Sequence, residues 1–232
     1  MRYSGFRVIA EALTGHKGWK PVWRDQAPQA EYDYIIVGGG GHGLATAYYL
    51  AKEFQQARIA VLEKGYLGGG NVGRNTTIIR SNYLLDGNEP FYEFSLKLWE
   101  GLEQDFNYNA MVSQRGIMNL IHTDAQRDAF TRRGNGMILN GADAELLNRD
   151  QVRAMYPFLN FDNARFPIKG ALMQRRGGTV RHDAVAWGYA RGADMRGVDL
   201  IQNCEVTGMR IENGRILGVE TSRGFIGAKK VG

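Results

Sequence analysis

A run of glycines between two apolar segments is the feature that most constrains how this chain folds. Residues 33–37 form a short apolar run, Asp-Tyr-Ile-Ile-Val, which ends at the glycine-rich residues 38–43. Residues 43–54 then carry apolar side chains at helical spacing, and residues 58–63 form a second apolar run. A buried parallel strand, a glycine turn, a helix and a second strand within about 30 residues are typical of a βαβ unit.

The glycine run, Gly-Gly-Gly-Gly-His-Gly, satisfies the pattern G-x-G-x-x-G. The first glycine of this pattern permits a tight turn, the second lets the backbone approach a pyrophosphate, and the third lets the helix pack closely on the strand. Glu63 ends the second apolar run, where an acidic side chain can bind the hydroxyl groups of a ribose. Since the pattern also follows a strand and opens a helix, the sequence predicts a site for an adenine dinucleotide.

The segment after Glu63 helps to decide between the two common adenine dinucleotides. NAD-dependent dehydrogenases usually continue with regular alternation of strands and helices. This chain continues with a glycine-rich loop, residues 64–75, and then with a region of mixed helical and strand-like pattern. An elongated flavin crosses its domain and needs a second contacting loop, so we expect FAD and keep NAD as the alternative.

The rest of the chain is expected to mix helices and strands. Residues 89–106 predict a helix whose apolar stripe faces the core: Phe91, Phe94, Leu98, Leu102 and Phe106. Further helices are expected near residues 123–133, 147–155 and 183–196, and strands at residues 116–121, 170–173, 198–201, 205–211, 215–221 and 225–231. Thr123 and Gln126 predict a capping box, and Asn213-Gly214 predicts a hairpin turn.

These elements suggest four segments along the chain. Residues 1–30 have no period and are expected to form an N-terminal extension, and residues 31–110 hold the FAD-binding βαβ unit and the flavin loop. Residues 111–175 would form part of a substrate domain, and residues 176–232 would return to the FAD domain with a β-meander. Because the last residues fall inside an expected strand, we expect a truncated chain, the fragment of a longer protein.

Composition excludes several other classes of protein. The single cysteine, Cys204, excludes an internal disulfide and an all-cysteine metal site, and we expect no metal. The apolar runs are far shorter than the roughly 18 residues of a membrane-spanning helix. The N-terminus lacks the apolar core of a signal peptide, so a cytoplasmic protein with no membrane partner is expected. The net charge of +5 is spread along the chain, which speaks against a nucleic-acid partner.

Four segments together resemble the β-subunit family of heterotetrameric sarcosine oxidases. They are residues 38–50, 73–83 (Gly-Arg-Asn-Thr-Thr-Ile-Ile-Arg-Ser-Asn-Tyr), 177–187 (Gly-Gly-Thr-Val-Arg-His-Asp-Ala-Val-Ala-Trp) and 201–208. The first segment by itself would indicate only the wider family of FAD-dependent amine oxidoreductases. The resemblance runs from about residue 3 to residue 232 and would cover roughly half or more of such a subunit.

The resemblance implies an α/β fold: a glutathione-reductase-like, FAD-binding Rossmann-type domain with an incomplete mixed α+β substrate domain. It implies flavin-dependent oxidative demethylation of sarcosine to glycine and formaldehyde, with electrons passing from FAD to FMN and then to oxygen, which gives hydrogen peroxide. FAD would be bound non-covalently and FMN covalently. The partners would be the α, γ and δ subunits of a heterotetramer, with NAD and tetrahydrofolate only on a partner subunit.

The resemblance also carries cofactor-binding residues onto this chain. The FAD pyrophosphate would be held by Gly38, Gly40, Gly41, His42 and Gly43. Glu63 would bind the adenosine ribose, and the backbone of Val206 would meet the adenine. The loop along the flavin would contribute Asn71, Arg74, Thr76 and Thr77.

Two further residues would carry the chemistry. Arg80 would bind the substrate carboxylate, because a guanidinium can bind a carboxylate through two parallel hydrogen bonds. His182 would carry FMN through a covalent bond to its imidazole ring. Thr77 departs from the monomeric relatives, which have an arginine at this position, and their catalytic lysine would lie beyond Gly232.

Two other functions stay open at this point. One is a dehydrogenase of dimethylglycine or of another N-methyl amino acid. The sequence around His182 speaks against it, because those relatives attach FAD elsewhere. The other is a non-catalytic flavin-binding subunit fragment. Sarcosine-dependent formation of peroxide, measured with and without partner subunits, distinguishes these possibilities.

Overall fold

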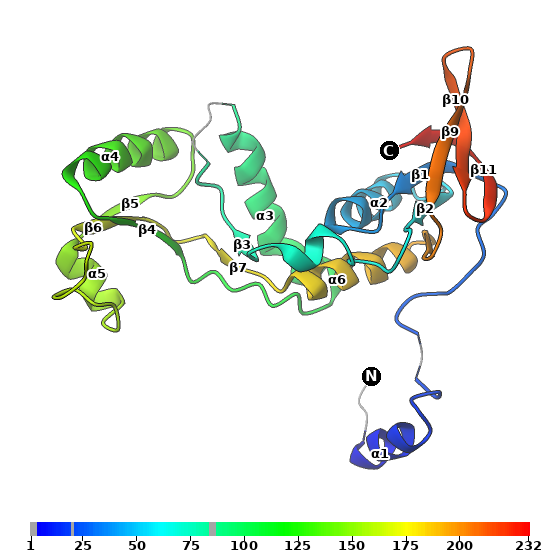
Figure 1. Cartoon of the computed structure of the whole chain (residues 1–232), viewed down its shortest axis with the longest axis horizontal. Coiled ribbons are helices and arrows are strands. Elements are labelled where there is room, and N and C mark those ends of the chain that lie inside the picture. The colour runs from blue at the N-terminus through cyan, green and yellow to red at the C-terminus, as the bar shows by residue number, and fades with distance from the viewer. Residues whose placement is uncertain (1–3, 20, 84–86) are drawn as a thin grey trace. The chain divides into compact units, whose positions relative to one another are not determined.

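The computed structural model describes residues 4–19, 21–83 and 87–232 (Figure 1). The chain separates into two compact units, of which the first comprises Met1–Gly70 and Tyr189–Gly232 and the second comprises Asn71–Gly188. Each unit has its own sheet and its own apolar core. Within the described residues, no helix is long and apolar enough to cross a membrane, and no cluster of side chains is suited to hold a metal ion.

The first unit is built around a six-stranded sheet with the order β8-β2-β1-β11-β10-β9. Its strands are β1 (Glu31–Val37), β2 (Ile59–Leu62), β8 (Asp199–Ile201), β9 (Val206–Glu212), β10 (Arg215–Thr221) and β11 (Gly224–Val231). β1 runs parallel to β2 and to β11, and β2 runs parallel to β8. β9, β10 and β11 form an antiparallel meander, and the helices are α1 (Gly5–Leu13) and α2 (Gly41–Glu53).

The apolar runs of the sequence explain the core of this unit. All four residues of β2 are buried, as expected for a parallel strand that is covered on both faces. α2 buries one face, which consists of Leu44, Ala47, Tyr48 and Ala51. The register aligns Val37 with Leu62 and Leu62 with Ile201, so β1, β2 and β8 end at one edge of the sheet. This is the edge at which open α/β sheets bind their ligands.

The second unit mixes helices and short antiparallel strands. Its elements are the 3₁₀ helix Asn71–Arg74, β3 (Ile78–Ile79), α3 (Glu89–Phe106), β4 (Ile117–Ile121), α4 (Asp124–Leu139), β5 (Glu145–Asn148), α5 (Arg149–Met155), β6 (Gly170–Gln174) and β7 (Gly178–Thr179). The strands form a three-stranded sheet with the order β4-β6-β5 and a small β3-β7 pair. α6 (His182–Asp194) begins in this unit and ends in the first.

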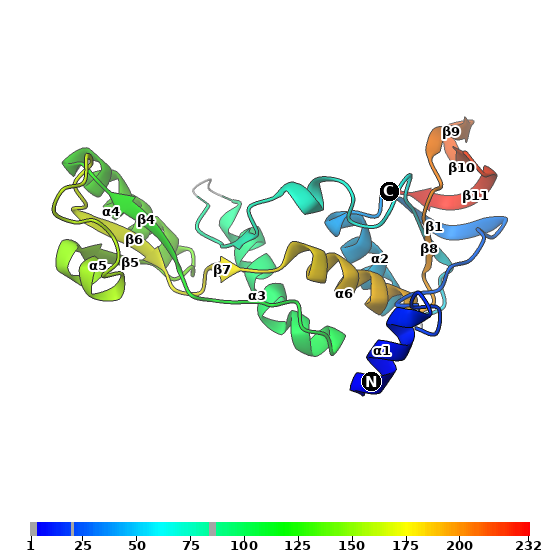
Figure 2. The same ribbon diagram turned by 60° about the horizontal axis from the view of Figure 1, so that its bottom comes forward.

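Helices cover both faces of the three-stranded sheet (Figure 2). Successive side chains of β6 point to opposite faces, as the pleat of a strand requires. Leu172 packs with Met137 of α4, whereas Met173 packs with Val152 of α5. The sheet thus has an apolar layer on each side.

Local predictions are partly confirmed. The capping box of α4 is present, and the hairpin turn at Asn213 and Gly214 has both residues at positive φ. Two expectations are wrong. Residues 5–13 form α1 and are not irregular, because Ser4 caps the helix by accepting a hydrogen bond from the Arg7 N–H. The helix expected from residue 147 begins two residues later, since residues 145–148 pair with β6.

The apolar stripe of α3 also differs from the prediction. Leu102 and Phe106 are buried, but Phe91 and Phe94 are 68% and 62% exposed. The N-terminal half of the helix instead buries two acidic side chains, those of Glu89 and Glu93, together with Leu96. A carboxylate is buried only where polar groups or cations compensate for the lost water.

Candidate functional site

The glycine turn in the first unit has the geometry that the sequence predicts. Gly38 has a φ of +103°, which favours glycine, and its N–H donates a hydrogen bond of 2.8 Å to the carbonyl oxygen of Leu62. A Cβ atom at Gly43 would overlap the carbonyl oxygen of Gly38, so the first turn of α2 lies directly against the strand. The N–H groups at the start of α2 have no partners within the helix, and together with the helix dipole they favour an anion.

Glu63 follows β2 and connects two loops at this edge. Its Oε2 accepts a hydrogen bond of 2.8 Å from the Gly39 N–H, and its Oε1 accepts one of 2.8 Å from the Gly65 N–H. The carboxylate therefore holds the glycine turn against the loop that begins at Lys64. Each carboxylate oxygen retains a second lone pair, so these bonds leave the side chain able to accept from a ribose hydroxyl.

Val206 and His42 lie at the same edge of the six-stranded sheet, but Val206 packs against the core and His42 is exposed. Val206 begins β9 and packs against the apolar core of the sheet. The segment before it is tied to the loop after β2, because the Cys204 N–H donates 2.9 Å to the Glu63 carbonyl oxygen and the Leu67 N–H donates 2.9 Å to Gln202 Oε1. His42 is the second residue of α2 and is exposed.

The predicted flavin loop lies on the surface of the second unit. Asn71, Arg74 and Thr76 are exposed. Thr77 has a φ of +61°, which is strained for a β-branched residue. The Asn75 side chain holds this conformation, since its Oδ1 accepts a hydrogen bond of 2.7 Å from the Thr77 N–H. Such strain is commonly found at functional sites.

Arg80 follows β3 and is half-buried. Its guanidinium lies 4.7 Å from the centre of the Tyr83 ring, and that ring stacks on Tyr92 at 3.9 Å. No carboxylate among the described residues pairs with Arg80, so its hydrogen-bond donors are available to an anionic ligand.

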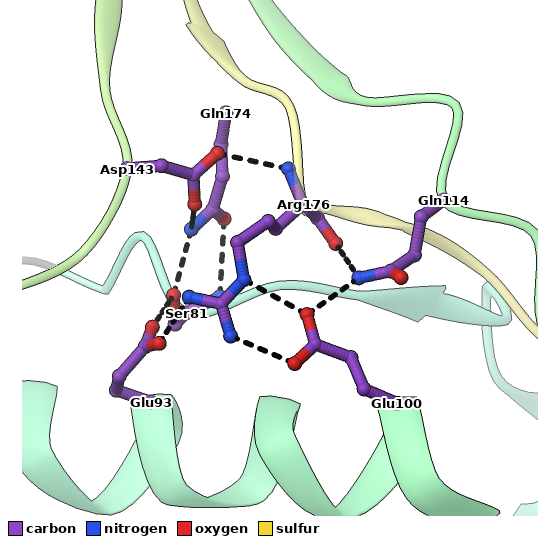
Figure 3. Close-up of polar contacts among 7 residues, drawn as sticks. All are labelled: Ser81, Glu93, Glu100, Gln114, Asp143, Gln174 and Arg176. Atoms are coloured by element: carbon purple, nitrogen blue, oxygen red, sulfur yellow. Dashed lines mark hydrogen bonds and ion pairs between the residues drawn. The ribbon is translucent and has the colours of Figure 1, made fainter.

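The residue next to Arg80 is held by a buried polar network (Figure 3). The Ser81 N–H donates 3.1 Å to Gln174 Oε1, and the Ser81 hydroxyl donates 2.9 Å to Glu93 Oε2. Gln174 Nε2 in turn donates to the Ser81 hydroxyl oxygen at 2.6 Å and to Asp143 Oδ1 at 3.1 Å. The segment that carries Arg80 is thereby fastened to α3 and to β6.

Arg176 carries the positive charge of this network. It pairs with Glu93, and it pairs with Glu100 through two bonds of 2.8 and 3.0 Å. Hydrogen bonding to Glu100 raises the pKa of Arg176, and the same contact lowers the pKa of Glu100. Arg176 is thus neutralised by carboxylates, in contrast to Arg80.

His182 is the first residue of α6 and is half-buried. Its Nδ1 atom is buried and has no hydrogen-bond partner. The next residue, Asp183, pairs with Arg181 at 2.9 Å. Burial raises the pKa of Asp183, but the hydrogen bonds from Arg181 and from the Ala184 N–H outweigh this effect and lower it overall.

The predicted residues fall into two groups, one in each unit. The glycine turn, Glu63 and Val206 lie at one sheet edge of the first unit, and the flavin loop, Arg80 and His182 belong to the second. Within the second unit, the Val180 N–H donates 3.0 Å to the Thr77 carbonyl oxygen, which joins the flavin loop to the segment before His182. The network around Ser81 was not predicted from the sequence. The one local feature that could have indicated it is that Glu89 and Glu93 share a helical face with the apolar Leu96.

A family model described as "FAD dependent oxidoreductase" matches residues 33–231, which include both groups. The chain belongs to the FAD-dependent oxidoreductase family. This membership confirms the predicted α/β fold. The glycine turn suits a pyrophosphate, because the start of α2 offers backbone N–H groups that have no partner within the helix.

Two relatives in this family are closely similar in sequence. "Sarcosine oxidase subunit beta" of Rhizobium meliloti (strain 1021) is 74% identical over 231 residues, which is 100% of this chain and 56% of the relative. The protein of the same name from an Arthrobacter species is 52% identical over 224 residues, which is 96% of this chain and 55% of the relative. The chain therefore spans just over half the length of these curated relatives.

A solved structure confirms the fold independently. L-proline dehydrogenase from P. horikoshii has a TM-score of 0.81 and 24% sequence identity to this chain, and the match covers 88% of this chain and 52% of that protein. At this identity the likeness concerns the fold alone.

Proposed function

We propose that this chain is part of the β subunit of a sarcosine oxidase, which oxidises the N-methyl group of sarcosine and yields glycine and formaldehyde. The observation that carries the proposal is the 74% identity to a sarcosine oxidase β subunit along the whole chain. The matched region covers 100% of this chain and therefore includes the glycine turn, the flavin loop, Arg80 and His182.

The first unit would hold FAD, which supplies the electron acceptor for oxidation of an amine. The pyrophosphate would lie at the start of α2, against Gly38, Gly40, Gly41, His42 and Gly43. Glu63 would bind the ribose, and the backbone of Val206 would meet the adenine. The conformation of Gly38 and the close approach of Gly43 support this assignment. Asn71, Arg74, Thr76 and the strained Thr77 would follow the flavin.

Arg80 would bind the carboxylate of sarcosine. Arg80 is half-buried and has no carboxylate partner among the described residues, so its guanidinium can form two charge-assisted hydrogen bonds to such a ligand. The network around Ser81 would orient it, because the backbone next to Arg80 is fastened on both α3 and β6.

His182 would hold FMN covalently, and this second flavin would supply the reduction of oxygen to hydrogen peroxide with electrons received from FAD. The buried Nδ1 without a partner supports a link at this ring. The word "subunit" in the names of the relatives supports a multi-subunit enzyme, and we infer α, γ and δ partners, with NAD and tetrahydrofolate on a partner subunit.

The proposal is tested with the full-length subunit, expressed together with its partners. Purified enzyme should produce peroxide and formaldehyde from sarcosine in equal amounts when tetrahydrofolate is absent. Dimethylglycine serves as the comparison substrate. Activity with dimethylglycine but not with sarcosine would contradict the proposal, and so would an assembled, flavin-loaded enzyme that oxidises neither.

A further inference from the structure

The arginines of the second unit differ in how their charge is balanced. Those that pair with carboxylates are Arg127, Arg149, Arg153, Arg175, Arg176 and Arg181. Within the described part of this unit, Arg80 and Arg133 are half-buried and pair with no carboxylate. Partial burial removes water from a charge, so an unpaired guanidinium at such a position needs another compensating group.

Arg133, on α4, lies beside the segment that carries Arg80. Its Nη2 atom donates a hydrogen bond of 2.8 Å to the carbonyl oxygen of Asn82. Its Nε atom is buried and has no partner. Burial lowers the pKa of Arg133, and the positive charge of Arg80 lowers it further. The two guanidinium groups therefore repel each other, and no described carboxylate offsets this repulsion.

Asn82 adds a polar group to this pair. Its side chain is fully buried, and neither Oδ1 nor Nδ2 has a hydrogen-bond partner. Native structures rarely leave a buried amide unsatisfied, because its lost hydration is not recovered. Arg80, Asn82 and Arg133 thus combine two unpaired cations with unused N–H donors, which is the chemistry that recognises a carboxylate.

We propose that Arg133 is a second cation of the substrate site and binds the carboxylate of the amino-acid substrate together with Arg80. This inference rests on the proposed function, because it takes Arg80 as the first cation of that site. A carboxylate offers about four lone-pair positions, so it can accept hydrogen bonds from two guanidinium groups and from the Asn82 amide. Its negative charge would also relieve the repulsion between the two arginines.

A purely structural role is the competing explanation, since Arg133 anchors the main chain at Asn82. That bond uses one of the five N–H donors of the guanidinium. A neutral side chain could supply one donor without placing a second positive charge near Arg80. The test must therefore separate the charge of Arg133 from its anchoring bond.

The test uses the assembled enzyme with Arg133→Gln, Arg133→Lys and, as the matched control, Arg132→Gln. Arg132 is the exposed neighbour on the same helix, and its replacement removes the same charge. The readouts are the KM for sarcosine and the inhibition constants of methoxyacetate and its neutral counterpart, methoxyacetamide. We expect Arg133→Gln to raise both the KM for sarcosine and the inhibition constant of methoxyacetate about 10- to 100-fold, because the variant loses a charge-assisted hydrogen bond.

The neutral methoxyacetamide should bind the wild type and Arg133→Gln equally. Arg133→Lys should give intermediate constants, because it keeps the charge but loses the planar fork. Arg132→Gln should match the wild type. Equal weakening of both inhibitors, or an unchanged KM, would overturn the role of Arg133. Arg80→Lys tests the proposed function separately: an unaltered KM in that variant would reject the carboxylate site at Arg80 itself.

Discussion

Gly43 has no room for a side chain, because a Cβ atom there would overlap the carbonyl oxygen of Gly38. Gly43→Ala must therefore displace the turn that begins α2. We expect this variant to lose most of its FAD and to be destabilised by about 1–3 kcal/mol, as overpacked sites usually are. The FAD released per chain measures the loss of cofactor, and urea unfolding measures the change in the free energy of unfolding. Gly5→Ala is the control, since Gly5 is exposed in α1 and a Cβ there meets nothing within 4 Å. Equal FAD loss in both variants would contradict the prediction.

Glu63 joins two loops through its two carboxylate oxygens. Glu63→Gln replaces one acceptor by an amide NH₂ group that faces a backbone N–H donor. We expect FAD affinity to fall roughly 10- to 100-fold, which corresponds to about 1.5–3 kcal/mol for a hydrogen bond to a charged group. Fluorescence titration of the apoprotein measures this affinity. Glu212→Gln, at an exposed position in the β9–β10 hairpin, should bind FAD like the wild type. An unchanged affinity for Glu63→Gln would rule out the ribose assignment.

At the scale of elements, ion pairs fasten α3 to the turn after β6. Hydrogen bonding to Arg176 lowers the pKa of Glu100 below its ordinary value of 4.5. A carboxyl group whose pKa is lower in the folded state adds stability that is fully present above about pH 4.5. This stability is lost as the pH falls through the folded-state pKa. The α3 attachment should therefore weaken in acid.

The measurement is the free energy of unfolding between about pH 3 and pH 7. We expect it to fall more steeply below about pH 4.5 in the wild type than in Glu100→Gln, which lacks the titrating group. The variant should also be less stable at neutral pH. Glu212→Gln again serves as the control and should reproduce the wild-type profile. Parallel profiles for the wild type and Glu100→Gln would show that this ion pair does not contribute.

At the scale of the whole molecule, the proposed covalent attachment of FMN to His182 can be tested directly. His182→Asn removes the nucleophilic imidazole, so the assembled enzyme should lose covalent FMN and retain dissociable FAD. Acid-precipitated subunit should then be colourless, whereas a tryptic peptide of the wild type that contains His182 should carry the mass of FMN. His122→Asn is the control. The FMN mass on another peptide would contradict the assignment.

The network around Ser81 shows why only part of the candidate site could be predicted. The glycine turn and Glu63 were found because their determinants lie within one βαβ unit, where spacing alone reports the strand, turn and helix. The network joins Ser81 to Gln174, 93 residues apart, and Arg176 to Glu93, 83 residues apart. No local pattern connects residues at such separations.

By itself, the sequence determined the order and type of most elements, the nucleotide-binding turn and the residue types available for chemistry. Only the tertiary structure decided which face of α3 is buried and which arginines are left without a carboxylate. The physical reason is that apolar periodicity predicts only the face of a helix whose burial is favoured by the hydrophobic effect. The burial of a charge depends instead on a partner that another element supplies, as Arg176 does for Glu93. Within the described part of the second unit, Arg80 and Arg133 are distinguished because they are half-buried and lack such a partner.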